Sequence, residues 1–284
     1  MKLIPRYFMQ YFMLLFAIVL TACVPIQAPV AAPAAAAPAS GDAAATGPVA
    51  ELSGEFEVVQ LIVDFAAGAW TPSHTHGGML VVTVRNGELT VRDDGGQETV
   101  YKPGESFVEI PGVYLEIGNA GTDVASVATI ALLPAGEKLT TTKEGISTDN
   151  APPGPTVTYQ HKQPVTEALG EFELQHLVSD FAPGAWTPSH THGGMLVVMV
   201  MNGELTVRDD QGAETIYKAG EAFVETPGTY LEIGNDGTDI ASVSTAALLS
   251  KGAQLTTVKE GISTDKVPPG PELKHKYVLA GNSK

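Results

Sequence analysis

The hydrophobic residues of this chain fall in short runs, and each run ends at residues that favour a turn. Asn86-Gly87, Pro103-Gly104 and Pro111-Gly112 are three such turns, because glycine and asparagine tolerate positive backbone angles and proline fixes its own. No segment between these turns predicts a long helix. The pattern predicts an all-β fold, with strands at Phe56–Phe65, Leu80–Val84, Glu88–Val91, Glu98–Tyr101, Ser106–Ile110, Tyr114–Ile117 and Val124–Leu133.

The same pattern occurs twice along the chain. Pro48–Pro155 aligns with Pro164–Pro271 without a gap, and roughly three-quarters of the positions are identical. A solenoid repeat would be shorter and would need more copies, so the alignment indicates two similar domains in one chain. About eight short strands per unit are compatible with a small barrel or a double-sheet sandwich. The predicted organisation has domains at 51–150 and 167–271, a linker at 151–166 and a C-terminal tail at 272–284.

The N-terminal residues 1–22 have the pattern of a signal peptide. Lys2 and Arg6 are basic, and the apolar run that follows is too short for a transmembrane helix. The run ends in Leu20-Thr21-Ala22-Cys23, which resembles the bacterial lipobox. That resemblance implies cleavage before Cys23 and lipidation of its thiol.

Residues 23–50 are dominated by alanine and proline, and the prolines interrupt any continuous helix. We therefore expect an extended tether between the lipidated cysteine and the folded part. Together, these segments predict an extracytoplasmic protein that is lipid-anchored to a bacterial membrane in the cell envelope.

The composition excludes several classes of function. Acidic residues outnumber basic ones by 32 to 16, and the formal charge of -16 argues against nucleic acid as an electrostatic partner. One cysteine cannot build a disulfide framework or a cysteine-rich metal site. The chain has no glycine-rich phosphate loop and no familiar nucleophile motif, so no residue is a candidate for covalent catalysis.

A pair of histidines stands at the same place in each unit: His74 with His76, and His190 with His192. Residues two apart on a strand share a face, so each pair can point into a barrel. Two neutral imidazoles placed in this way can serve as adjacent ligands of a divalent metal ion. The alternative is a pair of hydrogen-bonded histidines that line a pocket without metal.

The surroundings of these histidines resemble the cupin family. Gly68, His74, His76 and Gly87 have the spacings of its first motif. The second motif is matched at its glycines and asparagine, in each unit, by Gly104, Gly112, Asn119, Gly220, Gly228 and Asn235. The resemblance implies two tandem cupin-type β-barrels, each a double-sheet jelly roll, in a monomer built as a pseudo-dimer or in a homodimer.

Two of the four metal ligands of the family are absent from both units. Leu80 and Leu196 stand where the family has a glutamate, and Leu115 and Leu231 stand where it has a third histidine. Leucine offers no lone pair, so these positions cannot ligate a metal. We expect a two-histidine pocket with an apolar wall formed by these leucines.

Other residues near the motifs are candidates for the site. Glu109 and Glu225 are possible substitute ligands, although their direction does not follow from the sequence. Trp70 and Trp186 can line the barrel mouth, with ordinary sheet packing as the alternative. Glu116, beside an inward position, is expected to face solvent. His176 corresponds to Gln60 and so cannot serve a function common to both units, and His161 and His275 are predicted to lie on the surface.

Three functions are compatible with these observations. The loss of metal ligands and the apolar wall favour a binding module for a small molecule, with or without a weakly held divalent ion of manganese, iron, nickel, copper or zinc. The alternative is a metal-dependent enzyme, such as a dioxygenase or decarboxylase, with a reduced two-histidine site. In the third, the barrels provide only a rigid interaction surface. The sequence favours the binding module among these three functions, and a binding module is not an enzyme.

Overall fold

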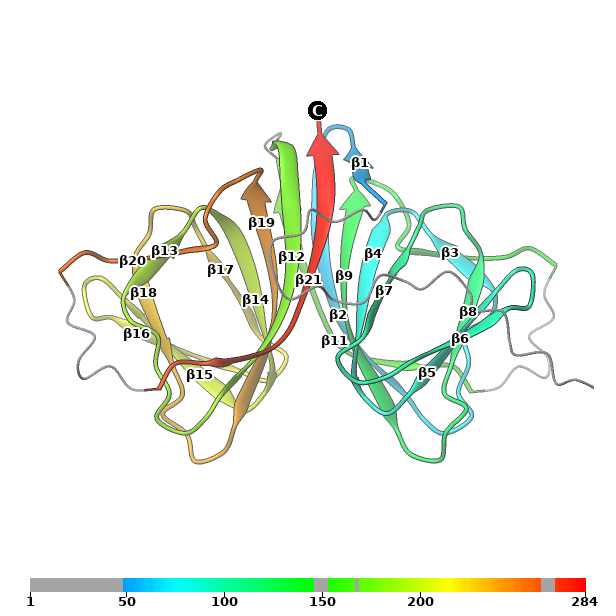
Figure 1. Cartoon of the computed structure of the whole chain (residues 1–284), viewed down its shortest axis with the longest axis horizontal. Helices are drawn as coiled ribbons and strands as arrows, with labels where there is room; N and C mark the ends of the chain where they lie inside the picture. The colour runs from blue at the N-terminus through cyan, green and yellow to red at the C-terminus, as the bar shows by residue number, and fades with distance from the viewer. Residues whose placement is uncertain (1–47, 146–152, 167–168, 262–268) are drawn as a thin grey trace, which may run out of the picture. The chain divides into compact units, whose positions relative to one another are not determined.

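The computed structural model describes residues 48–145, 153–166, 169–261 and 269–284. All regular structure in these residues is β-strand, as Figure 1 shows, and this confirms the predicted fold class. None of the described residues forms a helix with the length and apolar character needed to cross a membrane. The predicted signal peptide and Cys23 lie outside the described residues.

The first domain, barrel 1, consists of two five-stranded antiparallel sheets. Side chains from both sheets form one core inside the barrel, which includes Val59, Leu89 and Ile117. In spatial order, one sheet contains β11 (Thr156–Val165), β2 (Phe56–Phe65), β9 (Ala125–Pro134), β4 (Met79–Asn86) and β7 (Ser106–Glu109), and the other contains β10 (Thr140–Thr142), β3 (His74–His76), β8 (Leu115–Gly118), β5 (Leu89–Asp93) and β6 (Glu98–Tyr101).

The second domain, barrel 2, repeats this arrangement with one added strand. Its core includes Val198, Leu205 and Ile233. In spatial order, the six-stranded sheet contains β1 (Ala50–Leu52), β21 (Glu272–Ser283), β12 (Gly170–Phe181), β19 (Ala241–Ser250), β14 (Gly194–Asn202) and β17 (Ala222–Glu225), and the other contains β16 (Glu214–Lys218), β15 (Glu204–Asp209), β18 (Leu231–Gly234), β13 (His190–His192) and β20 (Thr256–Val258).

The middle parts of β2 and β12 are buried on both faces because the two barrels pack against each other. In β2, Val59 fills barrel 1, whereas Phe56 and Val58 belong to a second core that also contains Phe172 and Leu174 of β12. The rings of Phe56 and Phe172, which occupy equivalent positions in the repeat, stack with centroids 6.4 Å apart. A strand covered on both sides can be apolar nearly throughout, which explains the apolar run of β2.

One half of the interface between the barrels is polar. His275 Nε2 lies 2.8 Å from Ser106 Oγ, and Ser106 Oγ lies 2.7 Å from Thr83 Oγ1. His176 continues the chain, with its Nδ1 3.0 Å from Thr83 Oγ1 and its Nε2 3.0 Å from Ser244 Oγ. We call these five residues the polar chain. His176 is fully buried, and both of its ring nitrogens have a hydroxyl partner.

The equivalent half of the interface is mostly apolar. Ile62, Ala128, Met199 and Met201 form a buried cluster, against which Tyr159 and Ala222 pack. In the repeat, Met199 corresponds to Thr83, Ala128 to Ser244, Tyr159 to His275 and Ala222 to Ser106. We call this group the apolar plug. Four positions of the polar chain are therefore apolar in this half. The fifth, His176, corresponds to Gln60, whose buried amide donates to two backbone carbonyls of barrel 2.

Two segments differ from the sequence prediction. Most of the expected linker at 151–166 forms β11, which pairs along the whole of β2, and the expected tail at 272–284 forms β21, which pairs with β12. His275 lies on β21 and joins the polar chain, so its prediction as a surface residue was wrong. Both strands alternate side chains between solvent and the neighbouring barrel, and this weakens their apolar signal in the sequence.

The first described strand belongs in space to the second barrel. β1 pairs in parallel with the end of β21, with Leu52 opposite Ser283. Next to this pair, the Lys284 N–H donates to the Leu52 carbonyl at 3.2 Å and the Gly54 N–H donates to the Lys284 carbonyl at 3.0 Å. The segment that leads into barrel 1 is therefore held by barrel 2.

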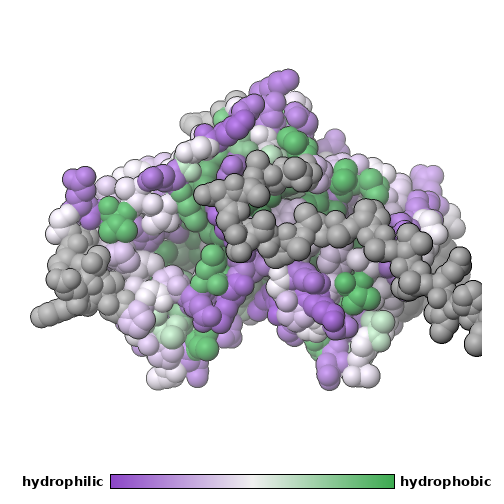
Figure 2. Space-filling view, viewed as in Figure 1, coloured by the Kyte–Doolittle hydropathy of each residue, from purple (hydrophilic) through white to green (hydrophobic). Residues whose placement is uncertain are grey.

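The surface has no single large apolar face in the view of Figure 2, where apolar residues lie in small groups among polar ones. The exposed large hydrophobic residues include equivalent pairs from the two barrels, such as Val100 with Ile216 and Val124 with Ile240. Scattered residues of this kind are normal on a soluble surface.

Candidate metal centre

The histidine pair of each unit lies on a three-residue strand inside the barrel. His74 and His76 occupy the two ends of β3, so both imidazoles point to the interior, where they are 4 % and 9 % exposed. Their rings meet edge to face with centroids 4.9 Å apart, and those of His190 and His192 on β13 are 4.8 Å apart. The predicted common face of each pair is therefore present in both barrels.

Backbone carbonyls fix the orientation of these imidazoles. His74 Nδ1 lies 2.9 Å from the Pro72 carbonyl and His76 Nδ1 lies 2.7 Å from the Leu139 carbonyl. A carbonyl oxygen only accepts hydrogen bonds, so both Nδ1 atoms carry a proton and donate it. In a neutral ring, this leaves a lone pair on Nε2, which is the arrangement found in metal-ligating histidines.

A glutamate from the opposite sheet completes the group. Glu109 ends β7, and its Oε2 lies 3.0 Å from His76 Nε2 and 3.7 Å from His74 Nε2. In barrel 2, Glu225 repeats both distances to His192 and His190. We call these two groups, His74/His76/Glu109 and His190/His192/Glu225, the triads. In each triad, the three donor atoms lie within 4.8 Å of one another.

The separations between donor atoms suit a single divalent ion. For bonds of about 2.1 Å, two ligands at a right angle are about 3.0 Å apart, and ligands at a tetrahedral angle are about 3.4 Å apart. The observed value of 3.0 Å lies at the lower end of this range, and 3.7 Å lies about 0.3 Å above its upper end. Two imidazoles and one carboxylate form the set that holds divalent iron and related ions with open coordination positions. The residues present therefore fit a metal ion.

The family motif places the ligating glutamate at the position of Leu80, on β4. In this chain the carboxylate comes from the neighbouring strand, β7. Leu80 on β4 lies directly opposite Glu109 on β7, and Leu196 lies opposite Glu225 in the same register. Side chains of directly opposite residues in an antiparallel pair share a face of the sheet and lie close together. A carboxylate on either strand thus reaches the same part of the barrel. Leu115, at the position of the third histidine, lies opposite His74 and provides no ligand.

The pKa values of the two histidines of a triad shift in opposite directions. Burial lowers the pKa of His74 below its usual value, and the attraction of Glu109 only partly opposes this. Burial also lowers the pKa of His76, but its hydrogen bond to Glu109 and the charge of that carboxylate outweigh burial, so the net shift of this pKa is upward. His190 and His192 repeat the two directions. A metal ion at the triad would compete with a proton held between His76 and Glu109.

A cavity of about 340 Å³ adjoins the triad in barrel 2. Its apolar wall includes Phe181, Val198, Leu205 and Ile233, and Val258 lies at its rim, where it is 44 % exposed. The residues that line this cavity do not include Trp186, Leu196 or Leu231, which the sequence predicted for the pocket wall. The apolar wall comes instead from residues that are not fixed positions of the family motifs.

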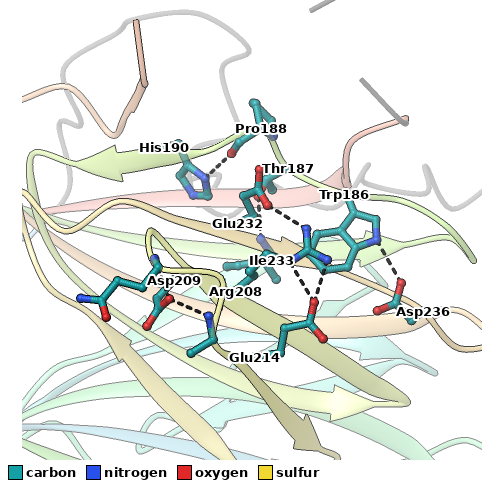
Figure 3. Close-up of polar contacts among 12 residues, drawn as sticks. Trp186, Thr187, Pro188, His190, Arg208, Asp209, Glu214, Glu232, Ile233 and Asp236 are labelled. Carbon is teal, nitrogen blue, oxygen red and sulfur yellow. Dashed lines mark hydrogen bonds and ion pairs between the residues drawn. The ribbon is translucent and has the colours of Figure 1, made fainter. Parts of the chain in front are cut away.

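The tryptophans pack against the sheet from outside this cavity. Figure 3 shows Trp186 beneath the guanidinium of Arg208, which is held by Glu214 and Glu232. The indole lies on the backbone of Gly234, where any Cβ would fall within its ring. Trp70, Arg92 and Gly118 repeat the arrangement in barrel 1, so sheet packing is the role of both tryptophans.

The other candidates of the sequence lie apart from the triads. Glu116 binds Arg92 at 2.8 Å and is partly exposed, as alternation predicted. His176 and His275 belong to the polar chain, and His161 is a half-buried residue of β11. The alternation of β7 could have placed Glu109, because Phe107 points inward and Glu109 is two residues further along the strand.

Comparison with known proteins assigns both barrels to the same family. A family model described as a cupin domain matches residues 61–131 and 177–247. The comparison with curated proteins gives no match. Among solved structures, the coconut allergen cocosin is 10% identical with a TM-score of 0.51, covering 70% of this chain and 79% of that one. Vicilin from hazelnut, Corylus avellana, has the same identity and TM-score over 70% and 76%. An oxalate decarboxylase variant from Bacillus subtilis is 13% identical with a TM-score of 0.45 over 71% of both chains.

Proposed function

The chain belongs to the cupin family, and we propose that each of its two barrels binds one divalent metal ion and presents it to a small molecule. The observation that carries the proposal is the place of Glu109 and Glu225, whose Oε2 atoms lie 3.0 Å from a histidine Nε2 in both barrels. Two histidines alone would hold a metal poorly, and the carboxylate supplies the third ligand and a negative charge.

The residues of the chain have separate roles in this proposal. His74, His76 and Glu109 would hold the ion through Nε2, Nε2 and a carboxylate oxygen, while the Pro72 and Leu139 carbonyls keep the imidazoles oriented. A bound divalent ion supplies Lewis acidity and open coordination positions. In barrel 2, the apolar wall of the cavity excludes water and packs against the body of a ligand.

A metal-dependent enzyme is the second candidate. Three protein ligands leave coordination positions free, as in oxygenases that use two histidines and one carboxylate. The cavity beside His190, His192 and Glu225 gives a substrate room next to those positions. Oxygen uptake by the iron-loaded protein in the presence of a small ligand would support the enzyme, and ligand binding without turnover would support the binding module.

We also propose that the chain is tethered to a membrane through Cys23. The lipobox-like sequence before this cysteine and the residues rich in alanine and proline after it support the proposal. The full chain should partition into detergent, and Cys23→Ser should release it to the aqueous phase. A wild-type chain that remains aqueous would contradict lipidation.

Metal content tests the proposed function directly. The full chain is purified in detergent without chelator, incubated with manganese, iron, nickel, copper or zinc, freed of excess ion and analysed by mass spectrometry. We expect about two equivalents per chain, one for each triad. His76→Ala and His192→Ala should each remove one equivalent, and the double variant should remove both.

His161→Ala is the matched control, because this histidine lies on β11 outside both triads and its loss should leave the metal content unchanged. Far-ultraviolet circular dichroism checks that each variant keeps its strands. Two equivalents retained in the folded double variant would overturn the assignment of the ligands.

A further inference from the structure

The cavity of barrel 2 has one kind of charge on its wall. Glu225 is the only carboxylate among the described residues that line it, and none of them is lysine or arginine. The remaining polar groups are the two triad histidines and hydroxyls of serine and threonine, including Thr187, Thr245 and Thr256. Among the described residues, the lining therefore offers an anion no cationic side chain to pair with.

Two described cations of barrel 2, Arg208 and Lys259, are already paired with acids. Arg208 binds Glu214 at 2.8 Å and Glu232 at 2.9 Å while it stacks on Trp186. Lys259, which directly follows β20, binds Asp210 at 2.8 Å. Neither residue lines the cavity. A second negative charge on a ligand would lose its hydration without gaining a cationic partner among the described residues, which is costly in an apolar site.

The charge of the triad sets the charge of the ligand that suits it. A divalent ion with one carboxylate and two neutral imidazoles has a net charge of one positive unit, and one negative charge on the ligand brings the site to neutrality. The rest of the ligand then binds more tightly if it is apolar, because it buries its surface against the apolar wall of Phe181, Val198, Leu205 and Ile233. The Thr187 hydroxyl accepts a hydrogen bond from the Ile233 N–H at 2.8 Å, so its own hydrogen is left to donate.

We propose that the ligand of barrel 2 is a small monoanion with one oxygen-donor head group and an apolar body, and that dianions are excluded. This inference rests on the proposed function, because the head group is expected to bind the metal ion. The volume of about 340 Å³ is at the small end of ligand sites, which limits the body to a size near that of one ring.

Four probes of matched shape separate charge from apolar body. Benzoate has one carboxylate and a ring, acetate has the carboxylate without the ring, and phthalate adds a second carboxylate to the ring. The fourth, 2-methylbenzoate, has a substituent at the same ring position as phthalate but only one charge. All four chelate weakly and leave the metal on the protein.

The titrations use the full chain with His76→Ala, which confines the metal to barrel 2. The protein is loaded with Co²⁺, whose visible absorption reports the metal and its ligands, and each probe is titrated by calorimetry at neutral pH. We expect benzoate to bind at least about tenfold more tightly than acetate or phthalate, and 2-methylbenzoate to bind more tightly than phthalate. Each binding event should change the Co²⁺ spectrum.

A variant at the rim of the cavity tests whether the lack of a cation disfavours dianions. Val258 is 44 % exposed, so Val258→Lys adds a positive charge at the cavity without burying it. We expect this change to raise the affinity for phthalate about threefold or more relative to benzoate. Thr142→Lys is the matched control, because Thr142 is the equivalent residue of barrel 1 and the change should leave the binding of both probes in barrel 2 unchanged.

The outcomes distinguish this inference from the proposed function. Phthalate that binds as tightly as benzoate, or Co²⁺ that binds while benzoate does not, would overturn the ligand class and leave the metal site intact. Co²⁺ that fails to bind would overturn the proposed function, and the ligand class with it. A Val258→Lys variant without a change in selectivity would show that the missing cation does not set it.

Discussion

The two triads and the two halves of the barrel interface began as copies of the same sequence but differ in how far they have diverged. Glu109 and Glu225 lie at the same distances, 3.0 and 3.7 Å, from their histidines. At the interface, equivalent positions carry Thr83 in the polar chain and Met199 in the apolar plug. The barrel interiors stayed alike while the surfaces between the barrels did not.

The difference follows from what each position faces. A triad residue faces the interior of its own barrel, and that interior is nearly the same in both units. An interface residue faces the other barrel, and the two halves of the interface need not match because both units belong to one chain. In a homodimer, every substitution appears on both halves. The duplication within one chain therefore allows one polar and one apolar half.

The largest effect is expected from removing the carboxylate of one triad. Glu109→Ala should weaken metal binding in barrel 1 by more than about 100-fold, above the loss typical of a residue that only orients a ligand. Barrel 2 should keep its equivalent of metal. Metal titration with mass spectrometry of the bound ion measures both sites.

Glu116→Ala is the control for this prediction, because Glu116 lies close in sequence but binds Arg92 outside the barrel. It should leave both equivalents in place. If Glu109→Ala retains both at full affinity, the carboxylate is not a ligand and the two-histidine pocket of the sequence prediction stands.

The next effect is expected at the interface. Thr83→Met copies the residue of the apolar plug into the polar chain, leaves His176 Nδ1 without its hydroxyl partner and crowds a packed site. We expect a loss of about 2 kcal/mol in the free energy of unfolding, measured by denaturant titration. Metal content should not change, because Thr83 is not a ligand.

Thr83→Ser keeps the hydroxyl and should cost less than half as much. An equal loss in both variants would mean that packing, and not the hydrogen bond to His176, stabilises this half of the interface.

The smallest effect concerns pH and the buried imidazole of the polar chain. Burial, with a smaller contribution from the nearby His275, lowers the pKa of His176 from 6.5 to about 3. The unfolded chain therefore binds a proton at this residue between about pH 6.5 and 3, where the folded chain does not. Stability is lost as pH falls through this window, since the unfolded state takes up the proton.

His176→Gln introduces the residue of the equivalent position, Gln60. It should cost about 1 kcal/mol at neutral pH through weaker hydrogen bonds, and this deficit should shrink as pH falls. Gln60→His should have the opposite effect on the slope, because it adds a second buried imidazole. Unfolding free energies measured across the pH range would contradict the prediction if the slope of His176→Gln equals that of the wild type.

The strands and the family could be predicted because their signals are local. Asn86-Gly87 ends one strand and begins the next at the predicted place, and Gly87 has a φ of 70° with Ala125 so close that a side chain would clash. β11 was missed because it covers β2 with one face and meets solvent with the other, so its residues lack an apolar run.

The triad and the interface needed contacts between residues far apart in the chain. Glu109 stands at a variable position of the second family motif, and its register opposite Leu80 shows that it reaches the same space. His275 and Ser106 are 169 residues apart, and no local pattern indicates that they meet. The two barrels could be predicted from the repeat and the resemblance to the cupin family, but the surfaces that join them could not.

The parallel pairing of β1 with β21 has a mechanical consequence. A pull on the chain before Ala50 acts along two paths, the covalent one into β2 and the hydrogen bonds between β1 and the last strand of barrel 2. A load along the axis of β1 is shared by several of these bonds at once, and β21 passes it on to β12. The tension is then divided between both barrels, and neither has to bear it alone.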